Sequence, residues 1–301
     1  MNKISKYLIT GLFFLLFLFS CQNQKNPDTS AASENAASSD KKTHISVSIP
    51  PLKWITEKIA GDDFTVTSVV SSNISPELFD PSVKTIEQLE ESDLYFSFDL
   101  FAFEHKLEDA VSNPGKIYNV LENNTGLLKE DENEHTGEGH SHGEYDPHVW
   151  FSMDIDSSIA ENIKNVLSEK YPEKKEIFEK NYSDFISEIN SFKTGLKDSV
   201  SSKKSRIFVI YHPALTYFAK EYDLTQISVE QEGKEPTAQY LQTVIDEIRK
   251  NNVAVLLVQP QFPKSSVELI SKEVPGIKII EFNPLEENIF DNLKKLTDSL
   301  E

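Results

Sequence analysis

The 301-residue sequence contains a single cysteine, Cys21. One thiol cannot form a disulfide within the chain, and it cannot supply the several thiolates of a structural zinc site. Any metal site must therefore use histidine, aspartate and glutamate side chains. The sequence also lacks the His-Glu-x-x-His motif that places two zinc ligands and a catalytic base on one helix in a large class of metalloproteases.

Basic residues are scarce. The chain has 30 lysines and arginines against 49 aspartates and glutamates, which gives a formal net charge of −19. Nucleic acid is excluded as a partner, because binding to its phosphates needs a basic surface. An acidic protein attracts cations instead.

No apolar run in the sequence is long enough for a plain membrane-spanning helix, which needs about 20 residues. The most apolar stretch covers residues 7–19, follows two lysines and ends in Leu18-Phe19-Ser20-Cys21. A positive start, a short apolar core and a small residue before the cleavage point are typical of an export signal. We therefore predict a lipoprotein signal peptide over residues 1–20 and lipidation of Cys21, which anchors the protein to a lipid bilayer outside the cytoplasm, in the periplasm or at the cell surface. An uncleaved signal anchor is the alternative.

The segment after Cys21 has almost no large apolar side chains and consists mainly of Gln, Asn, Ser, Ala and Lys. Such a segment cannot offset the entropy lost on ordering, so residues 21–43 are predicted to be a disordered tether. About 258 residues remain from His44 onward, enough for one large or two small domains.

Short β-rich runs alternate with helical patterns along the remaining chain, and the alternation occurs twice. This pattern is typical of parallel βαβ units. Strands are expected at residues 44–49, 64–70, 94–98, 116–120, 206–211, 226–229, 253–258 and 277–282. Helices are expected at residues 52–60, 83–91, 154–170, 214–222, 238–250, 267–273 and 289–300. We therefore predict an α/β fold of two four-stranded lobes, over residues 44–171 and 202–301.

Between the two predicted lobes lies a segment with a helical period of apolar residues. Residues 173–200 contain no proline and one glycine, Gly195. As one helix they would extend roughly 42 Å at about 1.5 Å per residue. We predict that residues 172–201 form one long rigid helix joining the lobes. Two helices with a break near Gly195 are the alternative.

Three of the seven histidines, His135, His140 and His142, fall within an acidic run at residues 130–146. Imidazole and carboxylate groups are the ligands that borderline divalent metals such as zinc prefer. We predict a flexible loop that binds metal ions with low affinity. A solvated charged loop with incidental histidines is the alternative.

Polar residues beside prolines follow several predicted strands. Ligands of open α/β sheets bind beyond the carboxyl ends of the strands, and proline stiffens the turns there. Glu77 and His148 would come from one lobe and His212 from the other, so we predict that they close around one divalent ion in the interlobe cleft. Taken singly, either histidine could be a core residue bonded to backbone, and Glu77 a helix N-terminal charge. The turns are Ser75-Pro76-Glu77, Asp146-Pro147-His148, His212-Pro213, Gln259-Pro260 and Asn283-Pro284.

Several short motifs are spread over nearly the whole of residues 44–301. They are Ile49-Pro50-Pro51-Leu52, Ile59-Ala60-Gly61-Asp62, Ser75-Pro76-Glu77, Asp93-Leu94, Asp146-Pro147-His148-Val149-Trp150, His212-Pro213-Ala214 with Tyr217-Phe218-Ala219, and Pro260-Gln261-Phe262. In this order they resemble the zinc/manganese ABC-transporter substrate-binding lipoproteins. The resemblance implies two lobes joined by a rigid helix, a buried metal between them, a monomeric state and delivery of the metal to a membrane permease. In the zinc-uptake branch a His- and acid-rich loop precedes the Asp-Pro-His motif, as here.

The chain also departs from that family at the expected metal site. The family usually has histidine in place of Glu77, and many members have an acidic residue at or near Asn283, whereas His148 and His212 match the family. A carboxylate is an acceptable exchange at position 77, since it binds zinc at about 2.0–2.2 Å. Asn283 is neutral and a poorer ligand. The fourth position is therefore left to Asn283, a water, a loop histidine or another carboxylate near the closing strand, such as Glu281 or Glu286.

Three functions compete at this point. The favoured one is the metal-binding component of an ABC importer, with Zn²⁺ as its cargo and Mn²⁺ or Fe²⁺ as alternatives. The second is a surface adhesin or host-interaction lipoprotein that also binds metal. The third is a zinc hydrolase with two histidines, one glutamate and an activated water. No residue marks a base beside such a water, so an enzyme is not expected.

Overall fold

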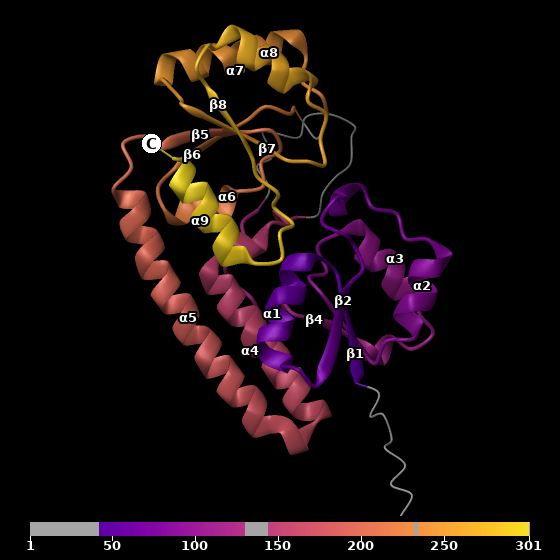
Figure 1. The fold of residues 1–301 in the computed structure, drawn as a ribbon. Coiled ribbons are helices and arrows are strands. Elements are labelled where there is room, and N and C mark those ends of the chain that lie inside the picture. The colour runs from indigo at the N-terminus through magenta and orange to yellow at the C-terminus, as the bar shows by residue number, and fades with distance from the viewer. Residues whose placement is uncertain (1–41, 130–143, 232–233, 301) are drawn as a thin grey trace, which may run out of the picture. The chain divides into compact units, whose positions relative to one another are not determined.

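The computed structural model describes residues 42–129, 144–231 and 234–300. Residues Lys41–Glu301 form one compact unit with two parallel four-stranded sheets (Figure 1). The predicted signal peptide, Cys21, nearly all of the predicted tether and the three loop histidines lie outside the described residues. None of the helices in the described ranges has the length and apolar character needed to cross a membrane.

The N-terminal lobe is built on the first sheet, whose strands are parallel and run in the order β2-β1-β3-β4. Its strands are β1 (Thr43–Val47), β2 (Phe64–Ser68), β3 (Leu94–Ser97) and β4 (Ile117–Asn119). Its helices are α1 (Pro50–Ala60), α2 (Val83–Glu90) and α3 (Ala102–Ala110).

The C-terminal lobe repeats this plan on the second sheet, whose strands run in the order β6-β5-β7-β8 and are again parallel. Its strands are β5 (Ile207–Ile210), β6 (Thr225–Ser228), β7 (Val255–Val258) and β8 (Lys278–Glu281). Its helices are α6 (Thr216–Glu221), α7 (Ala238–Asn251), α8 (Ser265–Glu273) and α9 (Ile289–Ser299). The prediction of two four-stranded α/β lobes is confirmed.

Two long helices, α4 (Met153–Lys170) and α5 (Lys175–Ser201), connect the sheets (Figure 1). Helix α5 is continuous through Gly195, where an added Cβ would meet no atom within 4 Å. The glycine therefore lies on an open face and does not break the helix. Because α5 packs on α1 of the N-terminal lobe and on α9 of the C-terminal lobe, it supports both. The predicted lobe boundaries at residues 171 and 202 stay a prediction.

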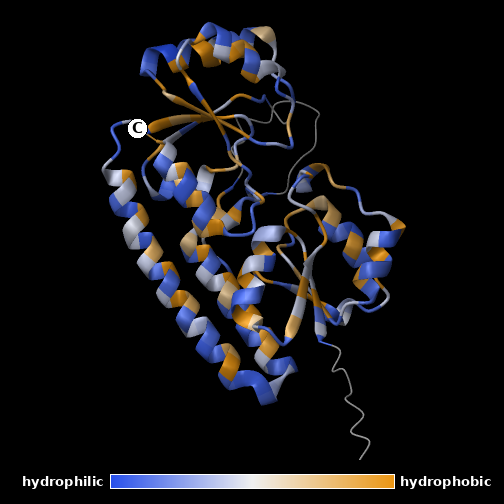
Figure 2. Ribbon diagram, in the orientation of Figure 1, coloured by the Kyte–Doolittle hydropathy of each residue, from blue (hydrophilic) through white to orange (hydrophobic). Residues whose placement is uncertain are grey.

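The two lobes share one hydrophobic core. A single cluster of buried side chains extends from the first sheet through α1, α4 and α5 to α9 and one face of the second sheet. A second cluster packs the other face of that sheet against α7 and α8. Figure 2 shows the strands mostly hydrophobic and the long helices mixed in character, as expected for elements with one buried face. The shared core resists motion of one lobe against the other.

Helix α3 and two loop structures were not predicted. Only Phe103 and Leu107 of α3 are buried apolar residues, so its amphipathic pattern is weak. Its N-terminus is held instead by the buried carboxylate of Glu104, which accepts hydrogen bonds from the backbone N–H groups of Leu100 and Phe101 at 2.9 Å each. The short 3₁₀ helices η1 (Pro76–Leu78) and η3 (Val149–Phe151) carry or follow predicted site residues.

Candidate metal site

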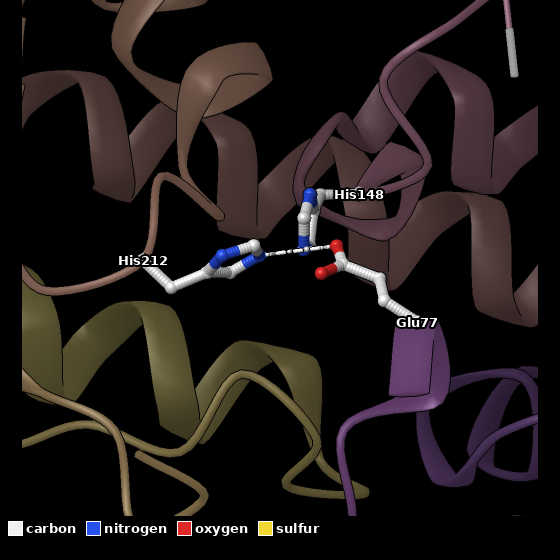
Figure 3. Close-up of side chains that lie close together, drawn as sticks. All are labelled: Glu77, His148 and His212. Atoms are coloured by element: carbon white, nitrogen blue, oxygen red, sulfur yellow. Dashed lines mark hydrogen bonds and ion pairs between the residues drawn. The ribbon is translucent and has the colours of Figure 1, made fainter. Parts of the chain in front are cut away.

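Three side chains from distant parts of the sequence point toward one another (Figure 3). The Oε1 atom of Glu77 lies 3.1 Å from Nε2 of His212 and 3.6 Å from Nε2 of His148. The two Nε2 atoms are 3.2 Å apart. Ligands of a tetrahedral zinc ion, each about 2.0–2.1 Å from the metal, are separated by about 3.3–3.4 Å. The three atoms are therefore spaced like three corners of a zinc site.

Proline-stiffened turns in the segments that follow strands position these side chains. Glu77 lies in η1, which begins at Pro76, and His148 immediately precedes η3. His212 follows β5, and the side chain of Gln259, which is fully buried, holds its backbone. Gln259 accepts a hydrogen bond from the His212 N–H at 3.0 Å and donates one to the His212 carbonyl at 2.6 Å. His212 thus lies two residues after β5, whereas Glu77 lies nine residues after the end of β2 and His148 lies 29 residues after the end of β4.

Buried carboxylates fix the orientation of both imidazole rings. Nδ1 of His148 lies 2.9 Å from Asp146, and Nδ1 of His212 lies 2.8 Å from Glu230. An ionised carboxylate only accepts hydrogen bonds, so each Nδ1 is the donor. In the neutral rings the Nε2 lone pairs then face each other and the Glu77 carboxylate. Three acceptors at this distance repel one another unless a proton or a metal cation lies between them.

The charges around the site shift two pKa values. Burial lowers the pKa of His212, but the carboxylates of Glu77 and Glu230 outweigh burial and hold it well above its ordinary value. The neighbouring carboxylates therefore favour the protonated form of the His212 ring. For the acid Asp146 burial has the opposite effect and raises the pKa. Its hydrogen bonds to His148 outweigh burial, so the pKa of Asp146 is lowered.

The site is enclosed and small. His148 and His212 are each 6% exposed, and the Glu77 side chain is 8% exposed. A cavity of about 20 Å³ adjoins them. This volume is enough for one water or ion. Other residues that line it come from both lobes and include Ser75, Trp150, Gln261, Phe262 and Leu285.

Hydrogen bonds between the lobes hold the turns that carry the site. The Tyr217 hydroxyl donates to the carbonyl of Asp146 at 2.9 Å, and the Trp150 indole donates to the carbonyl of Pro284 at the same distance. The His212 ring also stacks on Phe262, with centroids 5.0 Å apart. These contacts give the three ligand-type atoms a defined geometry before any ion arrives.

The remaining sequence candidates lie elsewhere. The amide oxygen of Asn283 accepts hydrogen bonds from Gln261 and from the Leu285 N–H, at 2.7 and 3.0 Å, so its predicted role as a ligand gains no support from the geometry. Glu281 and Glu286 are exposed. His135, His140 and His142 lie outside the described residues. A second group of metal-ligand types within those residues, Asp99, His105 and Glu108, lies near the surface, and its first two members are exposed.

Sequence reasoning missed the carboxylate partner of His212. Glu230 directly follows the β6 segment, so it obeys the strand-end rule that found the other residues. Glu230 was missed because the candidate residues were those that follow a strand and also lie beside a proline, and Glu230 has no adjacent proline. Asp146 was noted as part of a motif, but its bond to the imidazole ring was not predicted.

The chain is similar to proteins named for zinc uptake. The model of the family described as zinc-uptake complex component A, periplasmic, matches residues 45–301. The zinc-binding lipoprotein AdcA of Streptococcus pneumoniae strain R6 is 30% identical over 296 residues, which cover 95% of this chain and 56% of AdcA. The chain thus spans about half the length of the AdcA relatives that it matches.

Two solved structures have the same fold. A crystal structure of ZnuA superposes with a TM-score of 0.76 at 30% identity, covering 85% of this chain and 96% of that one. The Zn(II)-bound ZnuA-like domain of Streptococcus pneumoniae AdcA superposes with a TM-score of 0.68 at 28% identity, covering 86% and 99% of the two chains. This second structure explains why the chain covers only 56% of AdcA, because the chain matches the ZnuA-like domain of AdcA.

Proposed function

Because the chain belongs to the family of the periplasmic zinc-uptake complex component A, we propose that it is the extracytoplasmic metal-binding component of an ABC importer. It captures one divalent ion between its lobes and delivers it to a membrane permease. The observation that supports this proposal is the convergence of three buried acceptor atoms, from Glu77, His148 and His212, which need a cation between them. The predicted resemblance to zinc-uptake proteins is confirmed.

The proposed cargo is zinc. Two imidazole nitrogens and one carboxylate oxygen are donors that suit zinc, whereas manganese favours a larger share of oxygen ligands. The spacing of the three atoms fits a tetrahedral ion, and the relatives are named for zinc. The cavity beside them leaves room for one water as the fourth ligand. Mn²⁺ and Fe²⁺ are the alternative ions.

We propose further that the mature chain begins at a lipidated Cys21, acts as a monomer and stays at the outer face of a membrane. This rests on the signal-like sequence at residues 1–20, and the relative AdcA is named a lipoprotein. Mass spectrometry of the membrane-extracted protein tests it through the mass of two or three acyl chains on the peptide that contains Cys21. A Cys21→Ser variant should leave the membrane fraction.

The hydrolase alternative requires a general base beside a metal-bound water. Among the described residues that line the cavity, the groups that titrate are Glu77, His148 and His212 themselves. Their proposed role as ligands leaves none of them free as a base, which argues for binding and transport. A screen of the zinc-loaded protein against ester, peptide and phosphoester substrates tests this proposal, and turnover that disappears with His148→Ala would contradict it.

Metal analysis and thermal melting of the chain without its signal peptide test the central proposal. Protein purified without chelator should contain close to one equivalent of zinc. Zinc that binds only the folded state should raise the free energy of unfolding by about 2.7 kcal/mol at a free concentration 100 times the dissociation constant. The double variant His148→Ala/His212→Ala is the control and should show neither effect. Melting that does not respond to zinc, manganese or iron would refute the proposal.

A further inference from the structure

Two amide side chains of the C-terminal lobe donate hydrogen bonds to one carbonyl of the N-terminal lobe. Gln261 donates from Nε2 to the carbonyl oxygen of Ser72 at 2.6 Å, and Asn283 donates from Nδ2 to the same oxygen at 3.1 Å. The two amides also bond to each other, with Gln261 Nε2 2.7 Å from Asn283 Oδ1. Together these bonds connect chain segments about 190 to 210 residues apart.

Ser72 lies in the segment that carries Glu77. The backbone of this segment leaves the first sheet after Val70, whose N–H still bonds to the Ser48 carbonyl at 3.0 Å. It enters η1 at Pro76. Ser71, Asn73 and Ile74 beside it are exposed, with Ile74 44% exposed, and burial begins again only at Ser75 and Pro76. The bonds to the Ser72 carbonyl therefore tie the exposed start of the Glu77 segment to the second lobe.

The chemistry of the two amides suits this role. The Ser72 carbonyl is an acceptor, so only a donor can hold it, and an aspartate or glutamate at 261 or 283 would have none to offer. Gln261 Oε1 is buried and has no hydrogen-bond partner in the part of the chain that the structure describes. The two bonds that its Nε2 donates fix the orientation of the Gln261 amide. Exchanging its oxygen and nitrogen would place the oxygen against two other acceptors, the Ser72 carbonyl and Asn283 Oδ1. Asn283 is held in turn by the Leu285 N–H.

We propose that Gln261 and Asn283 are positioning residues of the metal site: they clamp the Ser72 carbonyl, hold Glu77 against His148 and His212, and so slow the release of the bound ion. This proposal rests on the proposed function, because it needs Glu77 as a ligand. Neither amide needs to touch the ion, since both act through the segment that joins Ser72 to Glu77.

The rate of zinc release tests the clamp. Zinc-loaded full-length protein is mixed with excess chromophoric chelator in a stopped-flow instrument. Gln261→Met and Asn283→Ala should each speed release by about 3- to 10-fold, the effect of losing one or two ordinary hydrogen bonds. Gln242→Met is the control, because Gln242 is also an amide of this lobe but bonds within α7, to Asp246 at 3.0 Å. It should leave release unchanged.

A double-mutant cycle with Glu77→Ala shows whether the clamp acts through Glu77. In the Glu77→Ala background, Gln261→Met and Asn283→Ala should change zinc release by less than about twofold. If the two amide variants speed zinc release by the same factor in both backgrounds, or leave the release rate unchanged in both, the clamp proposal is wrong. If Glu77→Ala by itself leaves zinc affinity unaltered, the proposed ligand set fails instead, so the two failures are distinct. Melting of each metal-free variant checks that it is folded.

Discussion

The Nε2 atoms of His148 and His212 lie 3.2 Å apart, although the residues come from different lobes and are 64 positions apart in the sequence. The Nδ1–H group of each ring donates a hydrogen bond to a buried carboxylate, so in the neutral rings these Nε2 atoms meet as acceptors. The lobes share a hydrophobic core that resists their separation. The proposed metal site thus joins ligand-type atoms of both lobes, and binding, pH and mutation experiments can test it.

Zinc binding should release protons and weaken in acid. Although burial lowers the pKa of His212, the carboxylates of Glu77 and Glu230 hold it well above its ordinary value of about 6.5, which favours a proton on this ring that bound zinc would displace. Affinity should fall as the pH drops from about 8 to about 5. Calorimetry in buffers of different ionisation enthalpy measures the protons released. A binding constant that stays flat over this range would show that the histidines are not ligands.

The same shift predicts how the metal-free fold responds to pH. A histidine whose pKa is raised by folding adds stability that is complete below the unfolded pKa of about 6.5 and disappears as the pH rises through the folded pKa. The metal-free protein should therefore lose this contribution as the pH rises above about 6.5, and His212→Ala should lack this part of the pH dependence. Urea unfolding at a series of pH values measures both.

Glu77→Ala should weaken zinc binding by at least about 10- to 100-fold. Changes in the groups around metal ligands commonly cost this much, and a ligand should matter no less. Glu77→His should keep binding and favour zinc over manganese, because imidazole is the softer donor. Asp80→Ala, which removes an exposed carboxylate three residues away that pairs with Lys106, is the control. Unchanged zinc affinity in Glu77→Ala, with a stability loss of about 1 kcal/mol, would show that Glu77 only favours its helix end.

Replacing the carboxylates behind the histidines should weaken zinc binding by about 10- to 100-fold. Asp146→Asn and Glu230→Gln keep the size of each group but remove the charge that makes the imidazole a stronger donor to metal. Asp63→Asn is the control, since Asp63 pairs with Lys174 at the surface. Competition titration with a zinc chelator measures the affinities. Wild-type affinity in both amide variants would mean that these carboxylates are not needed to orient the rings.

Deleting residues 130–143 should remove weak zinc equivalents and leave the tight one. The deletion removes His135, His140 and His142, which the sequence predicts to bind with low affinity. Lys129 and Tyr145 pair as an antiparallel bridge, so a short glycine-serine linker can join the ends without disturbing the Asp146 turn. Equilibrium dialysis at rising zinc concentrations counts both classes of site. Loss of tight binding would make one of the three histidines a ligand of the buried ion.

Asp156→Asn should stabilise the fold at alkaline pH. Both carboxylate oxygens of Asp156 are buried without a hydrogen-bond partner among the described residues, and burial together with the nearby Glu221 holds its pKa well above the ordinary value. An acid whose pKa is raised by folding costs stability increasingly as the pH rises above its unfolded pKa of about 3.9. The free energy of unfolding of the variant should thus rise relative to that of wild type as the pH is raised from about 5 to about 8.

The neighbouring residue Asp154 gives the control for this prediction. Its side chain is 76% exposed and pairs with Lys193 at 2.6 Å. Asp154→Asn should therefore change the free energy of unfolding little at either pH. Chemical denaturation of both variants at the two pH values makes the comparison, and equal pH profiles for Asp156→Asn and wild type would mean that Asp156 is not neutral in the native state.

The sequence by itself determined the two α/β lobes, the long helix and the turns that carry Glu77, His148 and His212. These features follow from local signals. Hydrophobic periodicity sets each element, parallel strands put their carboxyl ends on one edge, and a proline beside a polar residue marks a stiff turn. Helix α3 escaped prediction because a buried carboxylate, and not an apolar stripe, holds its start.

Only the tertiary structure decided which groups surround those three side chains. The bond between Gln261 and Ser72 joins residues 189 positions apart, and Glu230, which follows β6, meets His212, which follows the adjacent strand β5. Such partners depend on how the lobes pack, and packing is set by the summed burial of many side chains, which no local pattern encodes. The sequence thus places the atoms that can hold an ion, and the contacts between the lobes determine how firmly they are held.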